Sequence, residues 1–309
     1  MKQQVAGGAA MVSVAVVIWG VQFPVAMDLF ALIEPVNVAA IRSAVGALLL
    51  LAILGLVEGR AAIGYQGKAA QASVLGVVGT CASPLLMFWG MSFSRPEHAA
   101  ILVALQPSIA AVAVWLLRGR RPPTFSIGCI AIAFAGVVLL VTKGTGISLG
   151  GQELAGDAII LLGSVCGAIY NLGAERLSGW SPLRLATLTI MPGAIAGVLL
   201  AQLLSLAGWI ETPQAHTLAS AWRELAYLSV AGVTIAMLCF VAGLQQVGAL
   251  NAMLIMNLTP VVTFLMRFLQ GEQYLWVELA GGAIVVGALI ANNLYLRRQW
   301  AKKAARGTA

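Results

Sequence analysis

Charged residues are scarce in this sequence. They make up only 9% of its 309 residues, whereas 60% of the residues are hydrophobic. A soluble domain carries about 25% charged residues, and a chain with so few could not keep its surface in water. The composition therefore excludes an ordinary soluble globular domain and predicts a protein embedded in lipid.

Cysteine and histidine are also rare. Cys81, Cys129, Cys166 and Cys239 occur singly within apolar runs and form no CxxC pair, which indicates small residues that pack between helices. We expect no metal site and no cofactor. The net charge of +7 can indicate nucleic-acid binding. Its distribution along the chain favours membrane topology instead, so no nucleic-acid partner is expected.

Four long runs, residues 3–27, 69–94, 185–210 and 225–266, contain no charge at all. A helix that crosses the hydrocarbon core needs about 20 apolar residues, so the last run is long enough for two crossings. Barrel strands would alternate polar and apolar residues, and these runs do not. The segment 19–24 is too polar and aromatic for a signal peptide. We therefore predict an all-α membrane protein with ten transmembrane helices, at residues 5–27, 36–57, 70–93, 97–117, 124–142, 155–177, 182–209, 219–245, 250–269 and 275–296.

Basic residues set the expected orientation of these spans. If the N-terminus is cytoplasmic, most Lys and Arg residues fall in cytoplasmic segments, which matches the positive-inside rule. The cytoplasmic residues are Lys2, Arg60, Lys68, Arg118, Arg120, Arg121, Arg176, Arg184, Arg297, Arg298, Lys302, Lys303 and Arg306, and the external ones are Arg95, Lys143, Arg223 and Arg267. We expect both termini in the cytoplasm and the chain in a bacterial inner (plasma) membrane.

An internal repeat relates the two halves of the chain. A shift of 153 or 147 residues superimposes identical residues, namely Leu75 on Leu228, Gly79 on Gly232, Gly90 on Gly243, Pro107 on Pro260, Pro35 on Pro182 and Gly46 on Gly193. Each half has five expected spans, an odd number, so the second half is predicted to lie upside down. Inverted repeats are typical of transporters and place the substrate site near mid-membrane between the halves. The expected units are a first repeat at 1–145, a second at 150–297 and a basic cytoplasmic tail at 298–309.

Several motifs resemble the EamA-type branch of the drug/metabolite transporter superfamily. They are Trp19-Gly20-x-Gln22-Phe23, Ala39-x-x-Arg42, Gly79-Thr80 with Gly90, Leu105-x-Pro107 leading to Leu117-x-Gly119, and Leu258-Thr259-Pro260 leading to Leu269-Gln270-Gly271-Glu272. One departure is Arg120, where the family usually has an acid. The resemblance implies a central cavity lined by spans one to four and six to nine, with spans five and ten peripheral. Within the superfamily, exporters of aromatic and other amino acids are the most similar.

Polar side chains inside apolar spans are costly and often face a cavity, although they also serve helix packing. Trp19 and Gln22 in span one, and Tyr170 and Asn171 in the matching region of span six, are candidates for contacting a ligand. Arg42 in span two, where the second half has Thr189, is a candidate for binding a carboxylate with two hydrogen bonds. Snorkelling, or pairing with the acids at 28 or 34, is the alternative for Arg42.

Proline marks further candidates, because it removes a helix hydrogen bond and leaves a carbonyl free. Gln106 stands beside Pro107, and Asn257 lies shortly before Pro260. Structural kinks without ligand contact are the alternative. We predict substrate contacts also for Ser83, Met87, His98 and Asn251, with packing or solvation as the alternative, and helix kinking or gating for Pro24, Pro84, Pro107 and Pro260.

The predicted function is export of small metabolites, amino acids including aromatic ones, by alternating access. The partners are then the substrate and the lipid bilayer, and the protein is expected to be a monomer or weak dimer. Alternatives are another substrate class, such as drug-like or nucleotide-sugar-like metabolites, and an intramembrane hydrolase using Ser92 and His98, which lacks a third group to orient the base. Since no acid lies at mid-depth in a span, we expect facilitated or exchange transport rather than obligate proton coupling.

Topology labelling tests the inverted arrangement. Cysteines introduced near Arg120 and near Glu272, which follow equivalent spans of the two halves, should react from opposite sides of the membrane with a reagent that cannot cross it. Reaction of both positions from one side would contradict the antiparallel pairing of the halves.

Overall fold

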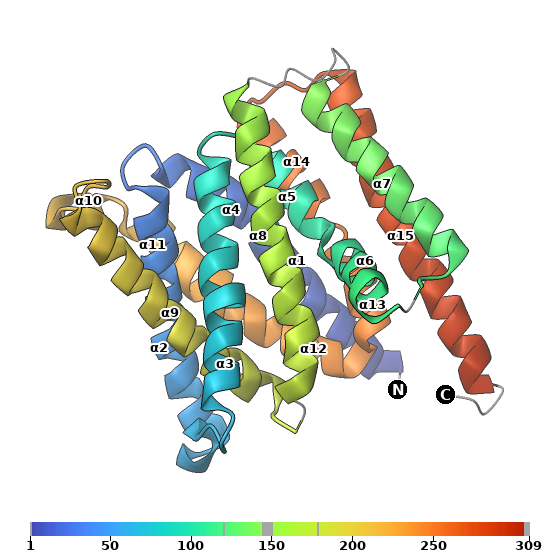
Figure 1. Ribbon diagram of the computed structural model, residues 1–309, viewed down its shortest axis with the longest axis horizontal. Helices are drawn as coiled ribbons and strands as arrows, with labels where there is room; N and C mark the ends of the chain where they lie inside the picture. Colours follow the sequence, from blue (N-terminus) through green and yellow to red (C-terminus); the bar gives the residue numbers. More distant parts are fainter. Residues whose placement is uncertain (1, 120, 144–150, 178, 306–309) are drawn as a thin grey trace.

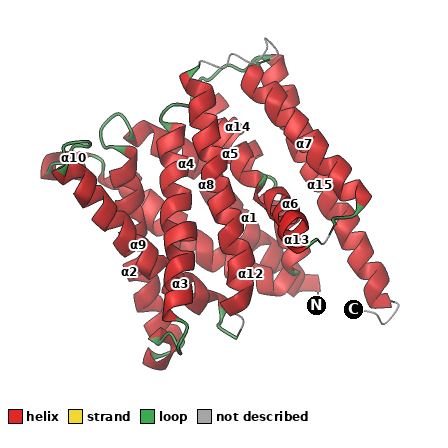
Figure 2. Ribbon diagram, viewed as in Figure 1, coloured by secondary structure: helices red, strands yellow, loops and turns green. Residues whose placement is uncertain are grey.

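The computed structural model describes residues 2–119, 121–143, 151–177 and 179–305, and these form helices joined by short connections, without strands (Figures 1 and 2). The first half contains α1 (Lys2–Leu29), α2 (Pro35–Val57), η1 (Arg60–Ile63), α3 (Ala69–Gly76), η2 (Val77–Ala82), α4 (Ser83–Met91), α5 (Pro96–Ala104), α6 (Gln106–Arg118) and α7 (Thr124–Thr142). The predicted topology residue Arg120 lies outside the described residues.

The second half repeats this order of elements. It contains α8 (Gln152–Ala174), η3 (Glu175–Leu177), α9 (Pro182–Leu206), α10 (Ala215–Ser220), α11 (Trp222–Ala226), η4 (Tyr227–Ile235), α12 (Ala236–Val247), α13 (Ala249–Met256), α14 (Thr259–Leu269) and α15 (Trp276–Ala305). Helix α15 continues beyond the predicted end of span ten at residue 296. Ala, Lys, Arg and Gln, which are good helix formers, make up most of residues 297–305, and they extend the helix into the expected tail, whose last residues 306–309 lie outside the described chain.

Eight helical segments in the described residues are long and apolar enough to cross a membrane. They are Ala6–Leu29, Pro35–Val57, Ala69–Met91, Thr124–Thr142, Gln152–Ala174, Pro182–Leu206, Trp222–Val247 and Trp276–Gln299. A ninth results if α5 and α6, which meet at 42° just before Pro107, count as one broken span. The predicted span at 250–269 is interrupted at Asn257-Leu258, between α13 and α14, so a count of ten stays a prediction.

Two of these spans contain a π-helical turn at equivalent positions. Segment η2 lies between α3 and α4, and η4 lies between α11 and α12. The shift of 153 residues carries Val77–Ala82 onto residues 230–235, which lie inside η4. Short π-helical insertions widen a helix locally and are frequent at functional sites.

The main contacts join the first half to the second. Helix α1 packs on α12, α4 on α8, α2 on α9, and α7 on α15. The α7–α15 pair stands at one side of the bundle, and both chain termini lie at the same end of it (Figure 1). We call this end the terminal end. The opposite end, where α4 connects to α5 and α14 to α15, is called the network end.

Glycines bring the backbones of the two halves close together. A Cβ on Gly90 of α4 would lie 2.6 Å from the Gly156 carbonyl oxygen of α8. A Cβ on Gly243 of α12 would lie 2.7 Å from the Gly8 carbonyl oxygen of α1. The two contacts are related by the repeat, since 90 + 153 is 243 and 8 + 148 is 156. Small residues at such crossings allow the close helix approach that stabilises membrane bundles.

Replacing Gly90 by Ala should lower the stability of the protein in detergent by about 1–3 kcal/mol, because overpacking forces the backbones apart. Gly128→Ala in α7 is the matched control, since nothing lies within 4 Å of its added Cβ and alanine favours the helix. Thermal unfolding followed by circular dichroism measures both variants. Equal melting temperatures would contradict the close packing of α4 on α8.

Candidate functional site

Two polar pairs occupy equivalent positions in the two halves. In the first half, Arg42 Nη1 of α2 donates to Gln22 Oε1 of α1 at 3.2 Å. In the second, the Tyr170 hydroxyl of α8 and the Thr189 hydroxyl of α9 are 2.9 Å apart. Shifts of 148 residues (22 to 170) and 147 residues (42 to 189) relate them. Gln22, Arg42 and Tyr170 are among the predicted site residues, and their role stays a prediction. Their contacts with one another and with Thr189 were not predicted.

Each pair lies against the π-helical turn of the opposite half. A Cβ on Gly232 of η4 would lie 3.5 Å from Gln22 Oε1, and Trp19 Nε1 donates to the Gly232 carbonyl oxygen at 2.9 Å. A Cβ on Gly79 of η2 would overlap the Tyr170 ring. Gly79 and Gly232 are equivalent in the repeat, but only Gly79 must be a glycine to admit the side chain from across the bundle, since a Cβ on Gly232 would make an ordinary contact.

Arg42 carries a positive charge with few partners. Its guanidinium lies over the Phe88 ring, 4.9 Å from the centroid, and its Nε is buried without a hydrogen-bond partner. Among the described side chains no carboxylate lies within 4.0 Å of it, so neither Asp28 nor Glu34 neutralises it. A buried, unpaired charge is costly. Arg42 is therefore suited to hold an anionic group that comes from outside the chain.

Other predicted residues surround this centre without joining one pocket. Met87 is buried beside Phe88 in α4, and Gln106 packs its amide against Gly167 of α8. Asn257 is buried, and its Nδ2 has no hydrogen-bond partner. The remaining predictions lie elsewhere, with Ser83 at the start of α4 against Gly163, Asn171 exposed on α8, and Asn251 donating to the Val247 carbonyl oxygen.

Hollows are small at mid-depth and larger at the terminal end. Between α2, η2 and α9, a hollow of about 10 Å³ is lined by Ser43, Thr80 and Cys81 among others, room for about one water. A hollow of about 330 Å³ lies between α3 and α8, lined by Ala70, Gln71, Val74, Leu75, Gly173 and Arg176. This larger hollow is open to the surface, and Leu75 and Gly173 contact each other beside it.

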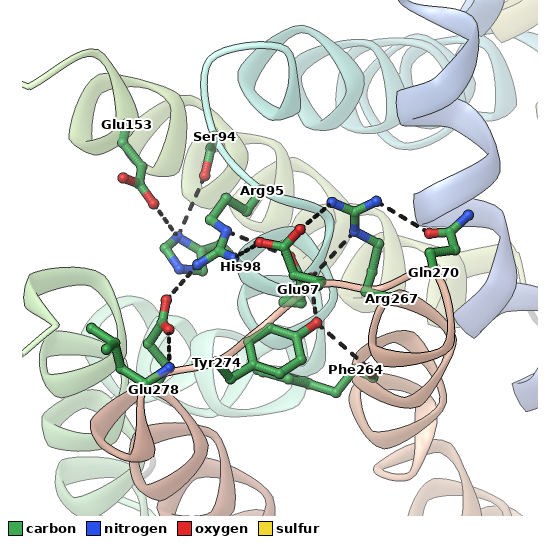
Figure 3. A network of polar contacts seen from close by, with 12 residues as sticks. Ser94, Arg95, Glu97, His98, Glu153, Phe264, Arg267, Gln270, Tyr274 and Glu278 are labelled. Carbon is green, nitrogen blue, oxygen red and sulfur yellow. Dashed lines mark hydrogen bonds and ion pairs between the residues drawn. The ribbon is translucent and has the colours of Figure 1, made fainter.

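The network end is closed by ion pairs that the sequence did not predict (Figure 3). Arg95 binds Glu272 and Glu278. Arg267 contacts Glu272 at 2.9 Å and Glu97 at 3.5 Å. These contacts tie the α4–α5 connection of the first half to α14 and α15 of the second. We call these five residues, with Tyr274, the ion-pair network.

Burial strengthens this network. Glu97 is only 1% exposed, and the Tyr274 hydroxyl donates to it at 2.5 Å. Burial, and then the Glu97 carboxylate, raises the pKa of Tyr274, so the phenol stays protonated and keeps donating. Burial lowers the pKa of Arg95, but Glu97, Glu278 and Glu272 together outweigh it and raise the pKa above its ordinary value. The guanidinium therefore stays charged.

His98 lies at the network end and not with Arg42. Its Nδ1 is 3.1 Å from both Asp157 oxygens, and the Ser94 hydroxyl donates to Asp157. His98 is 1% exposed and Asp157 4%, so His98 is not the solvated residue that its position at a helix start suggested. Sequence reasoning did not single out Asp157, which lies at the start of the span expected at 155–177.

Comparison with known proteins identifies the family. The sequence profile of the EamA-like transporter family matches residues 6–142 and again residues 154–294. The chain belongs to the EamA-like transporter family. It is therefore a multi-pass membrane transporter, as the resemblance of its motifs indicated.

Relatives and a solved structure agree with this assignment. The chain is 29% identical over 305 residues to the uncharacterized transporter YrdR of Bacillus subtilis (strain 168), covering 96% of this chain and 94% of the relative. It is 26% identical over 278 residues to the uncharacterized transporter YyaM of the same organism, covering 89% and 90%. A protein crystal structure with 18% identity aligns with a TM-score of 0.67 over 94% of this chain and 98% of the other, which shows a shared fold.

Neutralising Glu97 should loosen the network end. Glu97→Gln leaves two partly buried arginines with less negative charge, and breaking a buried pair costs about 3–5 kcal/mol. The melting temperature in detergent should fall clearly below that of the exposed control Glu211→Gln. If the two variants have the same melting temperature, the ion-pair network does not stabilise this end of the protein.

Proposed function

We propose that this EamA-family protein exports amino acids, aromatic ones included, from a bacterial cell by alternating access. The observation that carries the proposal is Arg42. It is a membrane-embedded cation without a carboxylate partner among the described side chains, held between the Gln22 amide and the Phe88 ring. A substrate carboxylate could bind the guanidinium with two hydrogen bonds, and the partly exposed Trp19 offers aromatic surface to its apolar part.

An inverted relation of the halves is supported by the contacts. Gly46 of α2 packs against Val233 of η4, and Gly193 of α9 against Thr80 of η2. The repeat exchanges these contacts, since 46 + 147 is 193 and 80 + 153 is 233. The family profile also matches the chain twice. Two halves that exchange roles can close one side of the membrane as the other opens.

Differences between the two ends suggest which state this is. Ion pairs join the halves at the network end, whereas a surface hollow opens between α3 and α8 near the terminal end. With the predicted orientation, this corresponds to a carrier closed to the outside. The direction of export rests on the resemblance to amino-acid exporters.

Two alternative functions fit the site less well. A nucleotide sugar carries several phosphate charges and calls for several cationic donors, whereas Arg42 stands alone at mid-depth. A hydrolase needs a histidine between a serine and an acid. Ser92 instead donates to the Trp89 carbonyl oxygen at 2.7 Å, and Ser94 and Asp157 both approach His98 on the same nitrogen, Nδ1. This geometry provides no base for a nucleophile.

A counterflow screen of amino acids with purified protein in liposomes tests the proposal. Arg42→Gln should reduce uptake of the best carboxylate substrate at least about tenfold, since a bidentate charged hydrogen bond contributes roughly 1.5–3 kcal/mol. Arg42→Lys should restore it only in part, because an ammonium cannot bind a carboxylate with the same planar fork. Arg223→Gln, at an exposed arginine of α11, is the control and should transport normally. Amino-acid counterflow that is unaffected by Arg42→Gln would contradict the proposed site.

A further inference from the structure

The His98–Asp157 pair is a buried acid–base contact that the transport site does not use. His98 of α5 belongs to the first half and Asp157 of α8 to the second, and both oxygens of Asp157 lie 3.1 Å from His98 Nδ1. The Ser94 hydroxyl donates to the same carboxylate. The pair therefore joins the two halves at the end that the ion-pair network closes.

Fixed positive charge does not balance the carboxylates around this pair. Five carboxylates take part in the ion pairs at the network end, namely Glu97, Glu153, Asp157, Glu272 and Glu278, against three obligate cations, Arg95, Arg267 and Lys143. Each arginine is already bound to acids of the network, and Lys143 pairs with Glu153 at 3.1 Å. Asp157 has no obligate cation of its own among these pairs, and His98 is the titratable base in contact with it.

Charged groups stand on several elements near the His98 helix α5, although of the described side chains only Glu153 and Asp157 are within 4.0 Å of its ring. On α8, Glu153 Oε1 lies 3.9 Å from Nδ1, next to Asp157. Lys143 follows α7, Arg267 is on α14 and Glu278 is on α15. Helix α1 places Asp28 at the same end, near Gln270, and α4 (Ser83–Met91) carries no titratable residue. The two charged groups within 4.0 Å of Nδ1, Asp157 and Glu153, are both carboxylates.

The contact with Asp157 uses Nδ1, so we assign the bound proton to the other ring nitrogen, Nε2. His98 Nε2 is buried and has no hydrogen-bond partner. When neutral imidazole donates through Nδ1 to a carboxylate, Nε2 carries the lone pair. Protonation of Nε2 turns the contact into an imidazolium–carboxylate pair, which neutralises the buried charge of Asp157.

We propose that the His98–Asp157 pair binds one proton while the network end is closed and releases it when this end opens. In the closed state, water is excluded and a lone Asp157 charge is costly, which favours the bound proton. In the open state, water solvates the carboxylate and separates it from His98, so the proton is held less tightly. By linkage, proton binding then stabilises the closed state, and the population of the open state increases as the pH on this side of the membrane rises.

This inference rests on the proposed alternating access but not on the substrate. The proton enters and leaves from one side only, so it regulates opening and is not carried across the membrane. Facilitated or exchange transport, expected from the lack of an acid at mid-depth, is compatible with such a pH-sensitive closure.

Distance measurements between two spin labels test the proposal without any substrate. Labels are attached to cysteines at Phe93, after α4, and Trp276, at the start of α15, both exposed at the network end. The four natural cysteines are replaced by alanine, and the protein is placed in lipid nanodiscs between about pH 5 and 8, where histidine changes charge. The population with long label-to-label distances, in which the network end is open, should increase with pH relative to the population with short distances. For one proton this ratio should rise by up to about tenfold per pH unit.

Matched variants distinguish a pH dependence caused by the His98–Asp157 pair from one caused by other titrating groups. His98→Gln and Asp157→Asn should remove the pH dependence, whereas His216→Gln, which changes the exposed histidine of α10, should leave it intact. Ser94→Ala removes a hydrogen-bond donor that stabilises ionised Asp157. The pH at which half of the distance change has occurred should therefore rise, while the distances still depend on pH.

Two results would overturn the proton site. One is a distance distribution of the labelled parent protein that does not change over this pH range. The other is a full pH response that survives in His98→Gln. Neither result depends on amino-acid counterflow, so the proton site and the proposed substrate can fail separately. If the substituted pair prevents folding, the parent profile and Ser94→Ala still decide the question.

Discussion

Helices inside a bilayer gain little from burying apolar side chains against one another, because lipid is equally apolar. The association of the two halves therefore depends on close backbone approach and on a few polar contacts. Glycines provide the approach at the α4–α8 and α1–α12 crossings. The same property admits the Tyr170 ring over Gly79. Close packing and the candidate site are in this way consequences of one constraint.

Polar groups are concentrated where this packing leaves room for them. At mid-depth, the two π-helical turns face the Gln22–Arg42 and Tyr170–Thr189 pairs. The pairs are equivalent in position but different in chemistry, since one contains a cation and the other only hydroxyl groups. The two sides of the candidate site therefore differ chemically, and the Gln22–Arg42 side is suited to a negatively charged group of a ligand.

The two ends of the bundle differ because their charges differ. By the shift of 153 residues, Arg95, Glu97 and His98 correspond to Gly248, Leu250 and Asn251. The side chains that form the ion-pair network at Arg95 and Glu97 therefore have no charged counterparts at the equivalent positions of the second half. Interactions of this kind are strong when water is excluded and weak when it enters. Such an end can be tightly closed and still be opened by a change in solvation or protonation.

Composition and charge-free runs were sufficient to predict a multi-pass helical membrane protein, because crossing lipid requires long apolar helices with internal hydrogen bonding. The repeat predicted which positions would correspond, including Arg42 with Thr189. The partners of Glu97, His98 and Asp157 could not be predicted, since these residues lie in connections or at helix ends, where sequence position does not show burial. Only the tertiary structure brings Arg95 to Glu272, 177 residues apart, because side-chain pairing across a bundle depends on how helices pack and not on the periodicity of any one of them.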